Sequence, residues 1–162
     1  MTESKYEKYV VRKAALVIDE DTDEVPETED IPIKNDADTG PMVIFSKRFV
    51  EEANSIVEYG IISDDITIGE GYVTGPHKHD YEEIFLFLGT DPKKPRDLGA
   101  EVEFWLGEGG DVEKLVVTTS SSIYVPPGVA HFPQFWRNVK RPVMTVVIMP
   151  NAEKRQLKAA SR

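Results

Sequence analysis

The chain has 162 residues, a formal net charge of −10 and no cysteine. This length suits a single domain with a sizeable core. The acidic charge argues against nucleic acid as a partner, because binding to phosphates needs a basic surface. The apolar run at 143–149 is far too short to cross a bilayer as a helix, so we expect no membrane partner. The N-terminus has no apolar signal region, and the absence of cysteine fits a reducing cytoplasm.

Short runs of β-branched and aromatic residues, separated by Gly, Pro, Asp and Asn, follow one another along the chain. They predict strands at 9–18, 42–50, 55–63, 66–74, 82–89, 101–107, 113–120, 122–128 and 142–149. The acidic stretch at 19–30 is expected to be a solvated loop, and the tail at 151–162 either a short helix or a frayed end. Many short strands with regular turn signals are typical of an all-β sandwich or barrel.

The first candidate site lies in the stretch GPHKHDYEE. Side chains alternate between the two faces of a strand, so an extended segment would place His77, His79 and Glu83 on one face. Phe85 and Phe87 would continue that face, and the residues between them are apolar as well. This pattern predicts one strand that carries two imidazoles and a carboxylate into the interior, with phenylalanine rings beneath them.

Such polar groups are costly to bury unless something satisfies them, and a divalent cation would do so. The stretch VPPGVAH supplies a further nitrogen ligand. Its two prolines end a strand, and Gly128 permits a tight turn that would swing His131 inward. The expected site therefore contains three imidazoles and one carboxylate: His77, His79, Glu83 and His131.

The opposing interpretation is that these histidines are ordinary core or surface residues, since an H-x-H pair often occurs by chance. All three histidines of the chain fall in the two stretches, which favours the metal site. Glu82 is an alternative ligand to Glu83 if the strand bulges at Tyr81.

The two stretches resemble the two motifs of the cupin superfamily. The first motif reads G-x5-H-x-H-x3,4-E-x6-G, and it is matched by Gly71, His77, His79 and Glu83, with Gly89 one residue early. The second motif reads G-x5-P-x-G-x2-H-x3-N, and it is matched by Pro126, Gly128 and His131. Ser120 stands at its leading glycine and Phe135 at its final asparagine, so the departures fall outside the ligands.

The resemblance implies a double-stranded β-helix, or jelly roll, with a metal bound near one mouth by the four ligands. It divides the single domain into an N-terminal extension of strands and acidic loop at 1–63, a barrel core at 64–150 and a C-terminal tail at 151–162. In the family, extra N-terminal strands often join the sheet of a partner, so a homodimer is expected.

The ligand set implies one divalent transition metal ion as cofactor but leaves its identity open among Fe, Mn, Ni, Cu, Co and Zn. Four protein ligands leave coordination positions for chemistry when the ion binds five or six ligands. We expect an aromatic pocket for a small-molecule ligand around the metal, formed by Phe85, Phe87, Tyr124 and Phe135.

Tyr81 and Glu82 are candidate catalytic residues because they neighbour the ligands in sequence. A basic cluster at 93–96 either covers the mouth or forms a solvated loop. The favoured function is a metal-dependent oxygenase acting on a small oxygenated organic substrate. Two alternatives stay open: a redox-neutral isomerase, decarboxylase or lyase, and a non-catalytic module that binds a ligand or a metal.

Overall fold

The structure is a computed structural model that describes residues 5–12, 15–16, 42–69, 75–152 and 158–160. The acidic stretch at 19–30 and the motif glycine Gly71 lie outside the described residues. The described helices are two short 3-10 turns, η1 (Glu7–Tyr9) and η2 (Gly109–Asp111). In the described part of the chain, no helix is long and apolar enough to cross a membrane.

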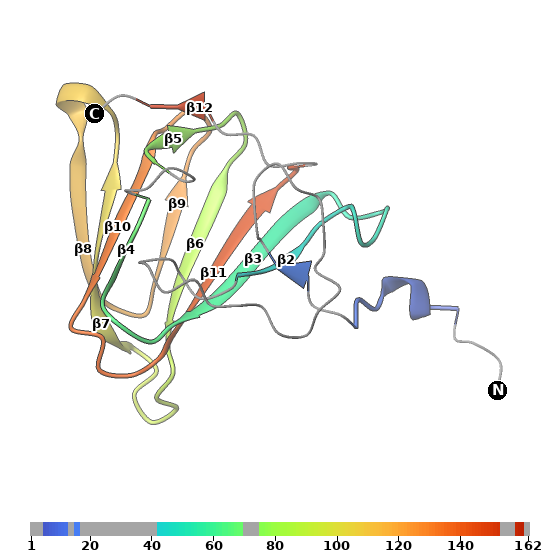
Figure 1. The fold of residues 1–162 in the computed structure, drawn as a ribbon, viewed down its shortest axis with the longest axis horizontal. Helices are drawn as coiled ribbons and strands as arrows, with labels where there is room; N and C mark the ends of the chain where they lie inside the picture. The colour runs from blue at the N-terminus through green and yellow to red at the C-terminus, as the bar shows by residue number, and fades with distance from the viewer. Residues whose placement is uncertain (1–4, 13–14, 17–41, 70–74, 153–157, 161–162) are drawn as a thin grey trace.

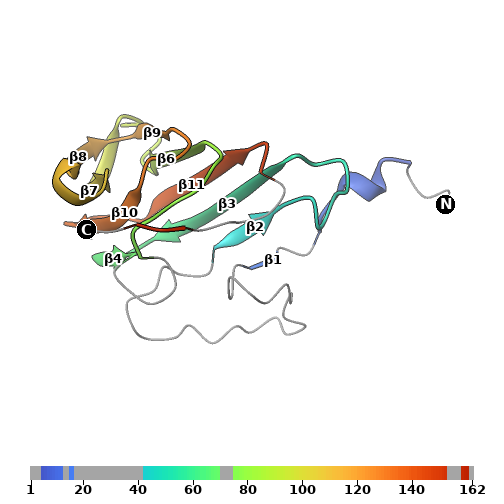
Figure 2. The ribbon, with the colours of Figure 1, turned by 90° about the horizontal axis from the view of Figure 1, so that it is seen from above.

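The strands form two antiparallel sheets that face each other, as Figures 1 and 2 show. Sheet A contains, in order, β1 (Ala15–Leu16), β2 (Val43–Phe45), β3 (Ser55–Ile62), β11 (Val143–Pro150), β6 (Glu83–Gly89) and β9 (Ser121–Val125). Sheet B contains β12 (Lys158–Ala159), β5 (His77–Lys78), β10 (His131–Arg137), β7 (Asp97–Leu106) and β8 (Glu113–Thr119), and β4 (Ile66–Ile68) also pairs with β10. The expected all-β jelly roll is confirmed.

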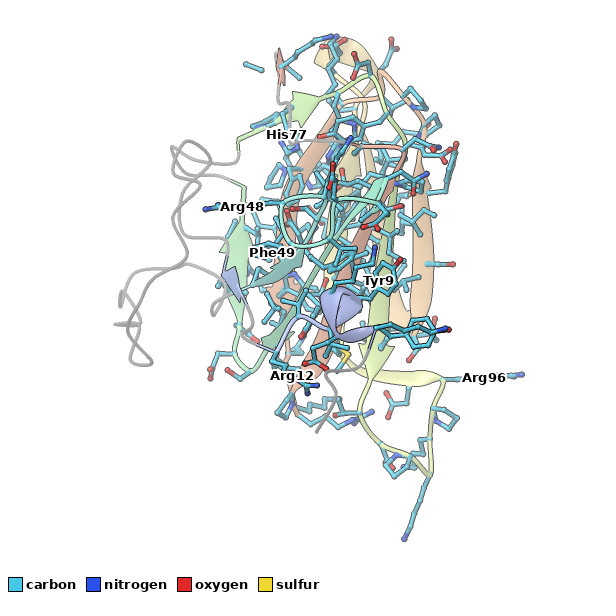
Figure 3. All side chains as sticks on the ribbon, turned by 90° about the vertical axis from the view of Figure 1, so that its right-hand side faces the viewer. Tyr9, Arg12, Arg48, Phe49, His77 and Arg96 are labelled. Atoms are coloured by element: carbon cyan, nitrogen blue, oxygen red, sulfur yellow. The ribbon has the colours of Figure 1, made fainter. Side chains whose placement is uncertain are left out.

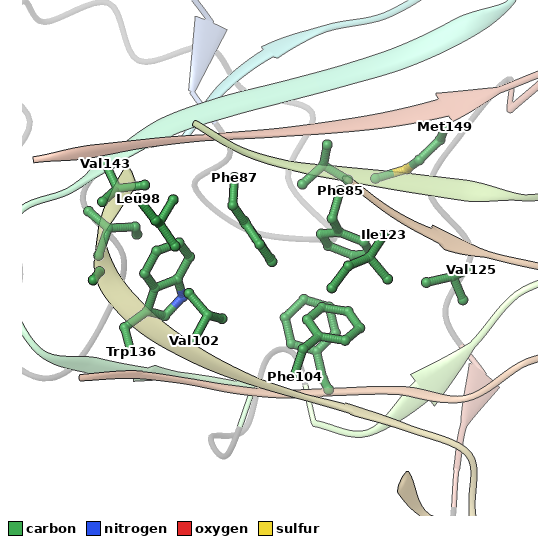
Figure 4. Close-up of a cluster of buried hydrophobic side chains, with 14 of the residues drawn as sticks. Phe85, Phe87, Leu98, Val102, Phe104, Ile123, Val125, Trp136, Val143 and Met149 are labelled. Atoms are coloured by element: carbon green, nitrogen blue, oxygen red, sulfur yellow. The ribbon is translucent and has the colours of Figure 1, made fainter. Parts of the chain in front are cut away.

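The core lies between the inner faces of the two sheets. In β6, Phe85 and Phe87 are fully buried, and they meet Phe104 of β7 and Trp136 of β10 from the opposite sheet (Figure 4). The ring centroids of Phe85 and Phe104 are 4.9 Å apart, and those of Phe87 and Trp136 are 5.1 Å apart, both edge to face. Aromatic rings prefer this arrangement, so the phenylalanines predicted to face inward close the gap between the sheets.

Several strands are shorter than predicted. The expected strand at 9–18 is wrong at its start, because Tyr9 belongs to η1 and its backbone N–H donates to Tyr6. The predicted strand at 42–50 ends at Phe45, because a turn begins at Ser46, whose carbonyl accepts from Phe49. In the tail, Lys158 and Ala159 form a strand rather than a helix, since they pair with β5.

The segment predicted as one continuous strand from His77 to Phe87 is instead two strands in different sheets. β5 ends at Lys78 in sheet B, and β6 begins at Glu83 in sheet A. The four residues between them turn the chain from one sheet to the other. The imidazole of His79 holds this bend by donating from Nδ1 to the carbonyl of Tyr81 at 2.7 Å.

Candidate metal centre

The four predicted ligands meet at one end of the barrel. His77 comes from β5, His79 from the bend after it, Glu83 from the start of β6 and His131 from the start of β10. Because β5 pairs with β10, His77 and His131 stand directly opposite each other. The turn before His131 is tied to the first stretch, since Gly128, at φ +81°, donates its N–H to the carbonyl of His79 at 2.7 Å.

One nitrogen or oxygen atom from each of these side chains lies within 4.8 Å of the corresponding atom of every other. All four residues are buried, with at most 5% of their surface exposed. The ring centroids of His77 and His131 are 4.3 Å apart, and those of His79 and His131 are 5.1 Å apart. The residues therefore form one compact cluster, which we call the His/Glu cluster.

Each imidazole is held by a backbone carbonyl two residues away. The carbonyls of Gly75, Tyr81 and Val129 lie 2.8, 2.7 and 3.2 Å from the Nδ1 atoms of His77, His79 and His131, respectively. A carbonyl only accepts, so each Nδ1 carries a proton, and each Nε2 is the nitrogen that would bind a metal. This arrangement orients the three rings, as is usual for histidines around bound metals.

The carboxylate of Glu83 lies between two of these nitrogens. Its Oε2 atom is 2.8 Å from Nε2 of His79 and 2.9 Å from Nε2 of His131. The approach to His131 has ion-pair distance without hydrogen-bond geometry, so this fully buried Nε2 has no hydrogen-bond partner among the described residues. A buried nitrogen without a hydrogen-bond partner costs free energy, and a cation bound by both His131 and the Glu83 carboxylate would satisfy both groups.

The charge states agree with a ligand set. Burial, reinforced by the neighbouring His131, lowers the pKa of His77 to about 4, so its imidazole is neutral at neutral pH. Burial opposes ionisation of Glu83, but the close approach of His131 and the hydrogen bond and charge of His79 outweigh it and lower the pKa of the carboxyl to about 2. A neutral imidazole and an ionised carboxylate are the forms that bind metal.

Three imidazole nitrogens and one carboxylate oxygen fit a divalent transition metal ion. The donor set contains no sulfur, because the chain has no cysteine. The cluster is thus able to hold one metal ion, and its donors are compatible with Fe, Mn, Ni, Cu, Co and Zn.

Two aromatic rings stack on the imidazoles of the cluster. The ring of Tyr81 stacks on His79 with centroids 4.0 Å apart and an interplanar angle of 10°. Phe132 stacks on His77 at 5.2 Å, and its backbone φ of +72° is one that residues with a β-carbon seldom adopt. Phe132 directly follows His131 in the sequence, which places its ring beside the ligands.

The structure separates the other predicted site residues. Phe85 reaches the cluster, with its ring centroid 5.8 Å from that of His131, whereas Phe87 packs deeper in the core against Trp136. Glu82 turns away from the cluster, and its carboxylate accepts a hydrogen bond from the Tyr124 hydroxyl at 2.8 Å.

Tyr124 and Phe135 lie on the outer faces of their sheets rather than in the interior. Tyr124 is 53% exposed between two buried neighbours of β9. Phe135 packs against Trp105, with ring centroids 5.5 Å apart. Strand alternation explains both positions, because each residue stands one place away from an inward-facing one.

The basic cluster at 93–96 lies at the opposite end of the barrel from His77, as the position of Arg96 in Figure 3 shows. It follows the end of β6, whereas Glu83 begins that strand, and six residues of strand span roughly 20 Å. The cluster is an exposed loop and does not cover the metal centre.

Comparison with known proteins places the fold but not the activity. No protein-family model and no curated protein sequence matches the chain. Among solved structures, a recombinant oxalate oxidase in complex with glycolate superposes with a TM-score of 0.53 at 14% identity, covering 77% of this chain and 56% of that one. A vicilin from Corylus avellana (hazelnut) has a TM-score of 0.52 at 12% identity, covering 75% of this chain and 32% of that one.

A cupin-2 domain protein from Rhodospirillum rubrum is a more distant match, with a TM-score of 0.46 at 12% identity over 75% of this chain and 66% of that one. The chain has the cupin fold. It spans about half the length of the oxalate oxidase chains and less of the vicilin. An oxidase and a vicilin match it almost equally well, so the fold alone does not determine what the chain does.

Proposed function

We propose that the chain is a metal-dependent oxygenase acting on a small oxygenated organic molecule, such as a diketone, catechol or hydroxy-carbonyl compound. The observation that carries this proposal is the His/Glu cluster, with its four buried ligand atoms within 4.8 Å of one another. When bound, a divalent transition metal supplies Lewis acidity and, if it is iron or copper, redox chemistry with O2.

The residues of the chain prepare the site in three ways. Backbone carbonyls hold the imidazoles in one orientation, so no reorganisation is needed when a ligand binds. The rings of Phe85 and Phe132 border His131 and exclude water, which strengthens electrostatic interactions at the centre. The deep burial of the ligands favours a small substrate over a polymer.

Tyr81 is the proposed positioning residue for the substrate. Its ring is half-buried and stacks on His79, which places a phenol beside a metal ligand. In this role the hydroxyl would donate a hydrogen bond to a substrate oxygen.

The cellular location that we propose is the cytoplasm, because its reducing environment fits a chain without cysteine.

Metal analysis of the purified protein and oxygen uptake test this proposal together. We expect one iron, copper or other transition metal ion per chain, and O2 consumption with at least one compound from a panel of diketones, catechols and hydroxy-carbonyls. A matched His131→Ala variant should lose both the metal and the oxygen uptake.

The same experiment separates the alternatives. Substrate conversion without O2 consumption would replace the oxygenase with a redox-neutral isomerase, decarboxylase or lyase. Tight ligand binding without conversion would assign the chain as a binding module. A protein that takes up none of the candidate metals after reconstitution would overturn the metal centre itself.

A further inference from the structure

Of the three cluster residues that lie on strands, His77 is on the shortest. Glu83 begins the seven-residue strand β6, which is paired on both sides, by β11 and by β9. His131 begins β10, which also has seven residues and pairs with β7. β5, which carries His77, has only two residues. So short a strand makes few backbone hydrogen bonds, and the position of His77 therefore depends on the strands that flank it.

The two strands that flank β5 pair with it unequally. On one side, β10 contributes a single register pair, His131 with His77. On the other side, β12 contributes two register pairs, at Lys158 and at Ala159. Figure 1 shows β12 beside β5 at one end of the barrel. In the described part of the chain, this short strand from the C-terminal tail thus supplies most of the pairing that β5 makes.

The register decides which residues of the tail hold β5. In an antiparallel pair, hydrogen-bonded and non-hydrogen-bonded residue pairs alternate. Ala160 donates its N–H to the carbonyl of Pro76 at 2.9 Å, so the next hydrogen-bonded pair is Lys158 with Lys78. The N–H of Ala159 points away from β5, toward the edge of sheet B that β12 forms. Lys158 and Ala160 therefore hold β5 by their backbone N–H groups, and Ala159 does not.

The other contacts of this segment do not replace that support. The carbonyl of Gly75 orients the ring of His77, but Gly75 belongs to the same segment and does not fix it to the sheet. The ammonium of Lys78 pairs with the carboxylate of Glu108. Both side chains of this ion pair are about one third exposed or more, and such pairs contribute little.

We propose that β12 is a positioning element for the metal centre: it holds His77 in place, and a bound metal in turn holds β12 on the sheet. Removing a group that supports a metal ligand from outside typically weakens metal binding 10- to 100-fold. Coupling between two binding events is reciprocal, so docking of β12 and binding of metal favour each other by the same factor. The inference rests on the metal ion of the proposed function but not on the reaction.

Proline variants of the full chain test the first half of the proposal. Lys158→Pro/Ala160→Pro removes both N–H donors that β12 gives to β5 and should weaken Zn²⁺ binding about tenfold in competition with a chelator. Ala160→Pro alone should have a smaller effect in the same direction. The matched control is Ala159→Pro, which places a proline where the N–H faces away from β5 and should bind Zn²⁺ as the wild type does. Circular dichroism checks that each variant keeps its strands.

Trypsin cleavage of the wild type tests the second half, which a purely structural role of β12 would not predict. Cleavage after Lys158 lies within β12 and requires this strand to leave β5. Zn²⁺ should therefore slow this cleavage about tenfold, the same factor as in the binding measurement. Cleavage after Lys93, in the exposed loop at the opposite end of the barrel, should proceed at the same rate with and without Zn²⁺.

The outcomes distinguish this inference from the metal centre on which it rests. Wild-type zinc affinity in Lys158→Pro/Ala160→Pro, or cleavage after Lys158 that zinc does not slow, would overturn the role of β12 and leave the metal centre intact. A wild type that binds neither Zn²⁺ nor any other candidate metal would overturn both. If the double variant does not fold, Ala160→Pro and the trypsin measurement decide the question.

Discussion

The two ends of the barrel interior are formed by the same strands but lined by opposite kinds of side chain. β6 begins with Glu83 and continues inward with Phe87, and β10 begins with His131 and continues with Trp136. One end gathers four polar ligands, and the other packs aromatic rings between the sheets. Stability and chemistry are therefore separated along single strands. Burial of apolar surface stabilises the fold at one end of the barrel. The other end holds polar groups whose interactions are only partly satisfied without a metal.

The largest effect is expected at the apolar end. Trp136→Ala should lower the free energy of unfolding by about 3–5 kcal/mol, because it leaves a cavity beside Phe87 where no solvent reaches. Urea denaturation measures the loss. Phe135→Ala, one residue earlier but on the outer face, should cost only about 1 kcal/mol, and equal losses in the two variants would contradict the assignment of inner and outer faces.

The second prediction concerns metal binding at the polar end. Metal present at a thousandfold excess over its dissociation constant should stabilise the wild type by about 4 kcal/mol, since metal binds only the folded state. His131→Ala should lose both the bound metal and this stabilisation, as measured by metal analysis and thermal denaturation.

Thr145→Val is the matched control for that prediction. Thr145 is a buried polar residue on the inner face of β11, outside the His/Glu cluster. The variant should bind metal as the wild type does. Full metal occupancy in His131→Ala would show that the cluster is not the binding site.

The third prediction concerns how the stability of the metal-free protein depends on pH. The pKa of His77 is about 4 in the folded chain and near 6.5 when the residue is exposed, so the unfolded chain binds more protons between these values. The contribution of neutral His77 to the stability of metal-stripped protein is therefore fully present above pH 6.5. The free energy of unfolding should fall by on the order of 3 kcal/mol as the pH drops from 6.5 to about 4. Glu83, whose pKa is lowered to about 2, adds a further loss below its ordinary value of 4.5.

Urea denaturation across this pH range provides the measurement. His77→Gln removes the titrating imidazole and should flatten the dependence between pH 6.5 and 4. A variant with the same slope as the wild type would assign the pH dependence to other groups.

The smallest expected effect comes from the ring beside the ligands. Tyr81→Ala removes the stack on His79, worth about 1 kcal/mol, and should weaken metal binding about fivefold in competition with a chelator. Tyr81→Phe keeps the ring and should bind metal normally while losing turnover. Normal turnover in Tyr81→Phe would rule out the proposed hydrogen bond to substrate.

Much of the fold was predictable from local patterns. The strands expected at 55–63, 82–89, 113–120 and 142–149 agree closely with β3, β6, β8 and β11, because alternation and turn residues act within a few positions of the chain. The four residues of the His/Glu cluster were also predictable as one group, since their spacing in two motifs does not depend on knowing the strand partners. Where prediction failed, as at Tyr124 and Phe135, the residues were aromatic but stood on the outward side of their strands.

The sequence by itself determined an all-β chain and the four residues of the His/Glu cluster, because periodicity and spacing are properties of neighbouring residues. Only the tertiary structure decided that the ligands come from two sheets. That outcome depends on two long-range pairings of His77. One is with His131, 54 positions later in the chain, and the other is with Ala159 in the C-terminal tail. Long-range pairing also decided which side of sheet A faces sheet B, since burial is a property of the assembled sheets and not of any single strand.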